Sequence, residues 1–372
     1  MPNIFDYVKW RGDLDFKNVE FNEIDNLILS RIAYFPFDNY LKEGEKVTLR
    51  EVYKLIEISN NKDNYLQKED IDFLPLLANS KRFGRIKLSD YVNKIDEKEE
   101  KQFSAITITL PNGYVYVAFR GTDNTIVGWK EDFNMSFQDL VPSQIDAVVY
   151  LENVGKKYRK KLIVGGHSKG GNLAVYSAMC CNEKVRERII GVYNNDGPGF
   201  QEDIINSKEY KEIISKVHTF MPQSSIIGRL LNNKGKCKIL KSTQTGIMQH
   251  DLYTWQVLGT KFIEDKFTNS SNFVDNTITQ WLKEVDAEQR GKFIDTLFEI
   301  LSKTNAKTIP EMGENWFISA KTILTTYKNI DEQNKQIILK TLTALFNIAK
   351  GNINVRKVTK LRKKYIGKKG KK

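Results

Sequence analysis

The chain has 372 residues, of which 40% are hydrophobic, so it is long enough to bury a sizeable core. Its three cysteines, Cys180, Cys181 and Cys237, show no metal-ligand spacing, which excludes a disulfide-rich scaffold and predicts reduced thiols. The first residues mix charges with apolar side chains, and no uncharged apolar run has the length of a membrane span. We therefore expect a soluble, cytoplasmic protein without a signal peptide.

The net charge of +12 is concentrated at one end of the chain. Residues 351–372 contain ten of the 58 lysines and arginines and no acidic residue, which leaves 48 basic against 46 acidic residues elsewhere. We expect a basic, disordered tail over this range. It either contacts an anionic membrane or nucleic acid peripherally or is a passively charged end, and no specific nucleic acid is predicted.

The first hundred residues show helical periodicity, as in "NEIDNLILSRIAYF", and end in a charged stretch, "NKIDEKEEKQ", that is typical of a connection. Next, "FSAITITL" and "YVYVAFR" flank "PNG", which predicts two strands joined by a turn. Four short buried strands follow, in "KLIVGG", "IIGVYNND", "SKVHTFM" and "CKILKS", with helices between them, one starting at Asn172. This alternation predicts an α/β fold with a mostly parallel central sheet and helices on both faces.

From about residue 270 onward, apolar residues recur at three- and four-residue spacing, which predicts further helices. The expected organisation has four parts: an N-terminal helical or cap segment (1–100), an α/β core (101–265), a C-terminal helical appendage (266–350) and the basic tail (351–372).

A G-x-S-x-G motif lies between a predicted strand and a predicted helix. It consists of Gly166, Ser168 and Gly170. This context is typical of a nucleophile elbow, in which a serine occupies a sharp, strained turn and glycines allow the strand and helix to approach closely. The alternative is a glycine-rich turn with no catalytic role.

A nucleophilic serine needs a histidine base, and the chain has only three histidines. His167 neighbours Ser168, and side chains adjacent on an elbow diverge. His218 lies within a predicted strand, where a structural role is favoured. His250 follows the last predicted strand, so it is the expected base.

The carboxylate that would orient this base is expected at Asp196, which directly follows the strand "IIGVYNN". The alternative is a turn aspartate, because Asp-Gly-Pro-Gly favours a turn whatever its function. Asp251 competes by proximity alone, and a residue adjacent to the base is poorly placed to accept its Nδ1 proton.

Acyl transfer also needs donors for the oxyanion. One is expected to be the backbone N–H of Lys169, directly after the serine and near the positive end of a helix. The other is expected at Thr122, which offers an N–H and a hydroxyl. Arg120 and Asp132 either tie this loop down or form surface ion pairs.

Together, "VAFRGTD" followed by Trp129 and Asp132, then "GGHSKGGNLA" and a late histidine resemble the fungal-type, or class 3, lipases, and the chain is most similar to their uncharacterised bacterial relatives. The resemblance covers roughly residues 100–260. It implies an α/β-hydrolase fold with Ser168 as nucleophile, His250 as base and Thr122 in the oxyanion hole.

The chain departs from this family at two positions. Lys169 replaces the usual leucine after the nucleophile, which would place a cation beside the site and favour an anionic substrate group. In "TFMPQSSIIGRLL", Ser224 and Ser225 stand where the family carries its aspartate. The acid has either moved one strand earlier, to Asp196, which is the explanation we prefer, or been lost.

These observations favour a serine esterase or lipase that cleaves a small-molecule or lipid carboxylic ester through an acyl-enzyme. One alternative is a catalytically inactive binding module with the same fold. Another is a membrane or nucleic-acid adaptor that uses the basic tail. No cofactor and no metal are expected. The acyl length and the oligomeric state are not predicted.

Overall fold

The computed structural model describes residues 1–59, 65–123, 125–135, 138 and 140–269, and beyond them 272, 276, 277, 280, 281, 284–302, 332, 335, 336 and 339. The chain divides into two units. One comprises residues 1–132 and 139–267, and the other residues 133–138 and 268–372.

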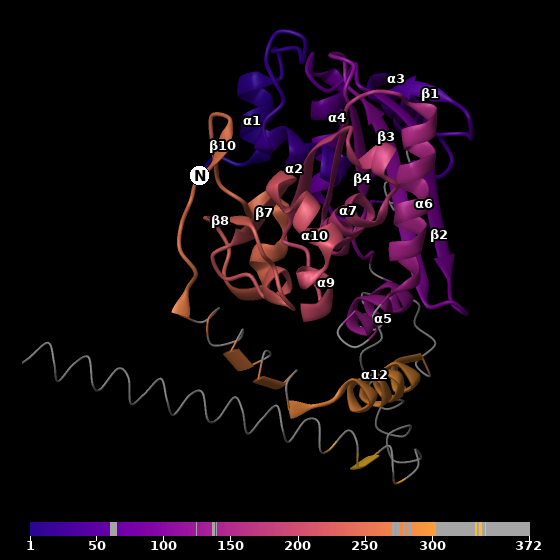
Figure 1. The fold of residues 1–372 in the computed structure, drawn as a ribbon. Helices are drawn as coiled ribbons and strands as arrows, with labels where there is room; N and C mark the ends of the chain where they lie inside the picture. The colour runs from indigo at the N-terminus through magenta and orange to yellow at the C-terminus, as the bar shows by residue number, and fades with distance from the viewer. Residues whose placement is uncertain are drawn as a thin grey trace, which may run out of the picture. The chain divides into compact units, whose positions relative to one another are not determined.

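The first unit is built on one eight-stranded sheet whose strands lie side by side in chain order (Figure 1). The strands are β1 (Lys46–Thr48), β2 (Lys87–Asp96), β3 (Lys101–Thr109), β4 (Val115–Phe119), β5 (Leu162–His167), β6 (Ile189–Asn195), β7 (Val217–Pro222) and β8 (Lys236–Leu240). Neighbours from β1 to β4 are antiparallel, and neighbours from β4 to β8 are parallel. The predicted α/β fold with a mostly parallel sheet is therefore confirmed.

Side chains of the central strands alternate between two separate hydrophobic cores, as the two-residue period of a strand requires. Tyr116 and Ala118 of β4 join one core, and Val117 and Phe119 join the other. On the first face pack the N-terminal helices α1 (Ile4–Arg11), α2 (Glu23–Ile32), α3 (Leu49–Ser59) and α4 (Glu69–Asn79). On the second face pack α6 (Pro142–Lys157) and α7 (Lys169–Cys180). Helices thus cover both faces, as predicted.

Helix α2 is the most deeply placed of the N-terminal helices, since every residue from Ile24 to Ile32 is buried. Buried ion pairs connect this helix to its neighbours: Arg31 pairs with Asp70 of α4, and Arg82 pairs with Asp25 at 2.5 Å. Such pairs are stable only when both charges are matched, so they hold the N-terminal helices in one arrangement against the sheet.

The sheet begins earlier than expected, because β1 and β2 lie within residues 1–100. The stretch "NKIDEKEEKQ", interpreted as a connection, contains the end of β2, a turn and the start of β3. Residues 93–95 of β2 are all exposed, so they lack the hydrophobic alternation that identifies a strand. Helix α7 also starts three residues before the expected Asn172, directly after Ser168.

Shorter elements complete the first unit. They are α5 (Ile126–Asn134), whose last two residues belong to the second unit, α8 (Glu183–Arg186), α9 (Glu202–Asn206), α10 (Lys208–Ile213), a strand pair β9 (Val257–Leu258) and β10 (Lys261–Phe262), and four 3₁₀ turns: η1 (Ile214–Lys216), η2 (Ile227–Arg229), η3 (Gly246–His250) and η4 (Leu252–Thr254).

In the second unit, α12 (Ala287–Ser302) confirms a helix within the expected C-terminal appendage. The ring of its Phe298 lies 5.9 Å from that of Phe133. Most of the helix expected over residues 335–350, and the whole tail 351–372, lie outside the described residues. Among the helices that the structure describes, none has both the length and the hydropathy needed to cross a bilayer.

Candidate active site

Ser168 occupies a strained turn between β5 and α7. Its φ of 58° and ψ of −135° are unfavourable for a residue with a side chain. The flanking glycines are required by close packing. A Cβ on Gly166 would lie 2.3 Å from the backbone of Gly170, and a Cβ on Gly170 would lie 2.1 Å from the carbonyl oxygen of Phe119. This is the geometry of a nucleophile elbow rather than of a relaxed turn.

His250 and Asp196 are in direct contact, although 54 residues separate them. His250 Nδ1 lies 2.7 Å from Asp196 Oδ2. The Asp196 side chain is fully buried, whereas a quarter of the His250 side chain is exposed. A carboxylate at Nδ1 fixes the tautomer of the imidazole and leaves Nε2 as the proton acceptor.

Asp251, the competing carboxylate, has a local role. It accepts a hydrogen bond from the backbone N–H of Tyr253 at 3.0 Å and so caps the turn η4.

Of the two neighbouring serines Ser224 and Ser225, Ser225 supports the carboxylate of Asp196 from the end of the adjacent strand. Ser225, just after β7, donates its hydroxyl to Asp196 Oδ1 at 2.5 Å. The backbone N–H of Asp196 donates to the carbonyl of Phe220 in β7 at 2.8 Å. The end of β7 therefore holds a carboxylate that comes from the end of β6.

The loop after β4 lies against the elbow because Phe119 of β4 pairs with Gly166 of β5. A Cβ on Gly121 would lie 2.8 Å from the Cβ of Ser168. The Thr122 hydroxyl donates a short hydrogen bond to Asp132 Oδ2, so it is occupied. The N–H of Thr122 has no partner in the part of the chain that the structure describes.

Lys169 presents its backbone N–H, rather than its charge, at the candidate site. As the first residue of α7, it has an N–H with no acceptor inside the helix. Its ammonium group is fully buried, lies 2.8 Å from Glu131 Oε2, and donates to the carbonyl of Gln102 at 2.8 Å. The expectation that Lys169 presents a cation to the substrate is wrong, because a buried charge must be paired within the protein.

Arg120 and Asp132 both tie down the loop after β4. Arg120 is 5% exposed and binds Asp123 and Asn93, so it is not a surface ion pair. Besides accepting from Thr122, Asp132 has a second oxygen, Oδ1, that is buried and accepts no hydrogen bond from any described residue. Burial raises the pKa of Asp132 to about 6, and nearby Lys169 and Thr122 partly oppose this shift.

Tyr34, which carried no sequence signal, and His167 join the loop after β4 to the loop that carries His250. The N–H of Gly121 donates to the hydroxyl of Tyr34 at 2.9 Å, and this hydroxyl lies 3.3 Å from His167 Nδ1. His167 Nε2 lies 2.8 Å from the carbonyl of His250. Burial and the neighbouring His250 hold the pKa of His167 well below its usual range, so His167 is neutral and its Nε2–H donates to that carbonyl.

The third histidine, His218, stacks on Tyr193, with ring centroids 5.0 Å apart. Within the described residues, no group of three or more His, Cys, Asp or Glu side chains could hold a metal ion.

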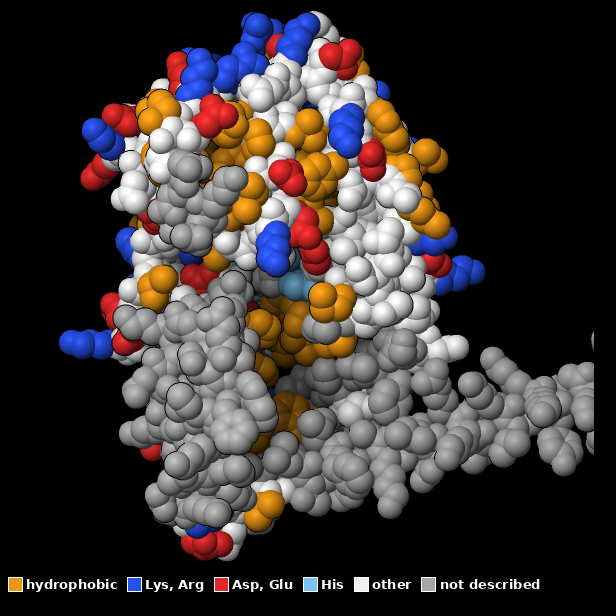
Figure 2. All heavy atoms as spheres, turned by 180° about the vertical axis from the view of Figure 1, so that it is seen from behind, with side chains coloured by type: hydrophobic (Ala, Val, Ile, Leu, Met, Phe, Trp, Pro, Cys, Tyr) orange, Lys and Arg blue, Asp and Glu red, His pale blue; other side chains and the backbone are white. Residues whose placement is uncertain are grey.

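Apolar side chains are exposed on the elements that carry the polar residues. Trp129 on α5 is 38% exposed, and Met248 on η3 is 62% exposed. Figure 2 shows a histidine at the surface with hydrophobic side chains gathered beside it.

Comparison with protein families identifies a relationship. The model of the Mbeg1-like family matches residues 77–299, a range that includes Thr122, Ser168, Asp196 and His250. A search of the curated proteins found no match.

Proposed function

Because the chain belongs to the Mbeg1-like family, which is lipase-like, we propose that it is a serine hydrolase that cleaves carboxylic esters through an acyl-enzyme. The observation that carries this proposal is the contact of 2.7 Å between His250 Nδ1 and the buried carboxylate of Asp196. It supports an oriented base on the same edge of the parallel sheet as the strained Ser168, where α/β folds place their sites. The likeness to class 3 lipases stays a prediction.

In the first half of the reaction, Ser168 Oγ adds to the ester carbonyl while His250 Nε2 takes its proton. The backbone N–H groups of Thr122 and Lys169 stabilise the oxyanion of the tetrahedral intermediate. The intermediate collapses when His250 returns the proton to the leaving alcohol, and Ser168 remains acylated. Asp196 stays ionised throughout and stabilises the imidazolium.

In the second half, His250 takes a proton from water, and the resulting hydroxide adds to the acyl carbon. Collapse of this second intermediate releases a carboxylic acid and returns the proton to Ser168. The exposed Trp129 and Met248 support an apolar acyl group on the substrate, because both lie on elements that carry site residues.

The test combines covalent labelling with turnover. A fluorophosphonate probe should label the wild-type protein and not Ser168→Ala, and chromogenic esters of increasing chain length should be cleaved by the wild type only. Loss of the nucleophile should lower kcat by roughly 10⁶-fold. Equal labelling of the two proteins would show that the nucleophile lies elsewhere. No labelling and no turnover in the wild type would instead support the inactive binding module.

A further inference from the structure

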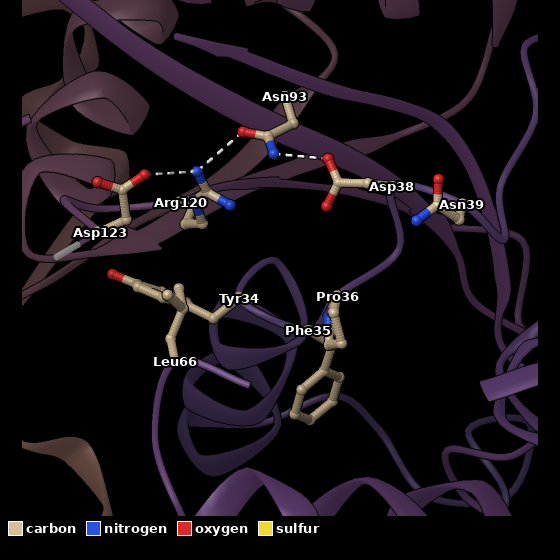
Figure 3. A pocket seen from close by; sticks show the side chains of 9 residues that line it. All are labelled: Tyr34, Phe35, Pro36, Asp38, Asn39, Leu66, Asn93, Arg120 and Asp123. Atoms are coloured by element: carbon tan, nitrogen blue, oxygen red, sulfur yellow. Dashed lines mark hydrogen bonds and ion pairs between the residues drawn. The ribbon is translucent and has the colours of Figure 1, made fainter. Parts of the chain in front are cut away.

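A polar pocket with a volume of about 340 Å³ opens beside the proposed oxyanion donor. Arg120 and Asp123, on either side of Gly121 and Thr122, line it, and so does Tyr34, whose hydroxyl accepts from the N–H of Gly121. The same short loop therefore forms both the oxyanion site and one wall of the pocket. Figure 3 shows the guanidinium of Arg120 between Asp123 and Asn93, facing the space between Tyr34 and Asp38.

Arg120 retains unused hydrogen-bonding capacity in this pocket. Its Nη2 donates to Asn93 Oδ1 at 2.9 Å and to Asp123 Oδ2 at 3.3 Å. Its Nε is buried and has no partner among the residues that the structure describes. Asn39 in the pocket wall is exposed, and its amide makes no hydrogen bond to any described residue. A ligand that brings hydrogen-bond acceptors can therefore pair with the guanidinium of Arg120 and with the amide of Asn39.

The charges of the lining disfavour anionic ligands. Arg120 is outnumbered by Asp38 and Asp123, so the described lining carries one net negative charge, which disfavours a phosphate or a carboxylate. A quaternary ammonium group would face Arg120 and offer its Nε no acceptor. An acyl chain would cover the polar lining. The polar groups would then lose their hydrogen bonds to water and gain none in return.

Hydroxyl groups match this lining, because each can donate one hydrogen bond and accept two. They can donate to the carboxylate of Asp38, which also accepts from Tyr91 and Asn93. They can accept from the guanidinium of Arg120 and from the amide of Asn39. Tyr34, Pro36 and Leu66 provide apolar surface for the C–H groups between hydroxyls. The volume lies at the small end of ligand pockets, which span about 300–1,000 Å³.

We infer that this pocket binds the alcohol part of the substrate and that this part is a sugar-like, polyhydroxylated group. The inference rests on the proposed ester hydrolysis. It makes Arg120, Asp38 and Asn39 specificity-determining residues that discriminate between alcohols rather than between acyl chains.

The kinetic test compares two esters with the same acyl chain, a glucose 6-octanoate and an ethyl octanoate. The ratio of kcat/KM for the sugar ester to that for the ethyl ester should exceed one in the wild type and fall by about 3–10-fold in Asn39→Ala and in Asp38→Asn. The loss should lie in KM. Asn18→Ala is the matched control, because Asn18 is an exposed asparagine that lines a different cavity, together with Phe21 and Tyr193. It should leave the ratio unchanged.

An unchanged ratio in both pocket variants, or a wild-type ratio below one, overturns the inference. A binding measurement separates this failure from failure of the proposed function. Saturation-transfer NMR of methyl glucoside with the Ser168→Ala protein should show binding that Asn39→Ala weakens and Asn18→Ala does not. If neither ester is cleaved, this experiment still decides: binding that depends on Asn39 supports the pocket, and the absence of such binding contradicts it.

Discussion

The loops after β6 and after β4 leave the sheet at the same edge, yet their key residues are held in different ways. Asp196, after β6, is held by Ser225 and by the backbone of Phe220, both from the neighbouring strand β7 and its end. Thr122, after β4, is held by Asp132 of α5, and α5 is connected to the elbow through the buried contact between Lys169 and Glu131. The proposed acid–base side thus depends on the sheet, and the proposed oxyanion side depends on one helix and one buried ion pair.

The sharpest test of the acid–base side is Asp196→Asn. The amide keeps the size of the side chain but favours the wrong tautomer of His250, so kcat for ester hydrolysis should fall by about 10⁴-fold. Asp251→Asn is the matched control, since Asp251 only caps the following turn, and its kcat should stay within severalfold of the wild type. An equal loss in both variants would show that Asp196 has no special relation to the base.

On the oxyanion side, a substitution at the buried ion pair should mainly lower the stability of the fold. Lys169→Met leaves Glu131 buried without its cation, which should lower the free energy of unfolding by about 3–5 kcal/mol in urea denaturation. The double variant Lys169→Met, Glu131→Leu removes both charges and should recover part of that loss. Recovery is incomplete because the buried N–H groups of Gln102 and Ser143 lose Glu131 as their acceptor. If the double variant loses as much free energy of unfolding as Lys169→Met and Glu131→Leu lose together, the two charges do not interact.

The acid–base side was largely predictable from the sequence, for reasons that the structure makes plain. Glycines around Ser168, a shortage of histidines and an aspartate directly after a buried strand are local patterns, and parallel strands bring their ends to one edge. Asp196 and His250 do meet there.

The oxyanion side was predicted less completely, because its supports are contacts between distant segments. Tyr34 ends an ordinary apolar helical stretch, and Glu131 lies in a helix with mixed charge, so neither stands out. Lys169 was misjudged for the same reason. The sequence shows its charge and not the buried carboxylate that pairs with it. The early strands were missed because exposed, charged β2 residues show no alternation.

His167, between the two loops, should make stability depend on pH. Because its pKa in the folded protein lies well below the usual value, the unfolded chain binds more protons. Its contribution to stability is therefore present above pH 6.5 and is lost as the pH falls below that value, by up to about 1.4 kcal/mol per pH unit.

In urea denaturation at pH 5.0, 6.0 and 7.5, His167→Gln should show a shallower loss of stability on acidification than the wild type. His218→Gln is a demanding control, since the pKa of this half-buried histidine is also lowered, though less. A wild-type slope unchanged by His167→Gln would mean that His167 is not held neutral.

The variant with the smallest expected effect, Thr122→Val, distinguishes the hydroxyl of Thr122 from its backbone N–H as the oxyanion donor. The hydroxyl of Thr122 donates to Asp132, which is ionised at pH 8 because its pKa is about 6. The backbone N–H of Thr122 is therefore left for the oxyanion.

Thr122→Val removes the hydroxyl and keeps the N–H and the branched shape. At pH 8 it should lower kcat by less than about tenfold, with about 1 kcal/mol less stability because Asp132 loses its donor. A loss of about 10²–10³-fold in kcat is the cost of removing an oxyanion donor, and it would assign that role to the hydroxyl instead. Thr122→Ser, which retains both groups, should restore kcat and stability in either case, so the comparison isolates the hydroxyl from the packing of the loop against Ser168.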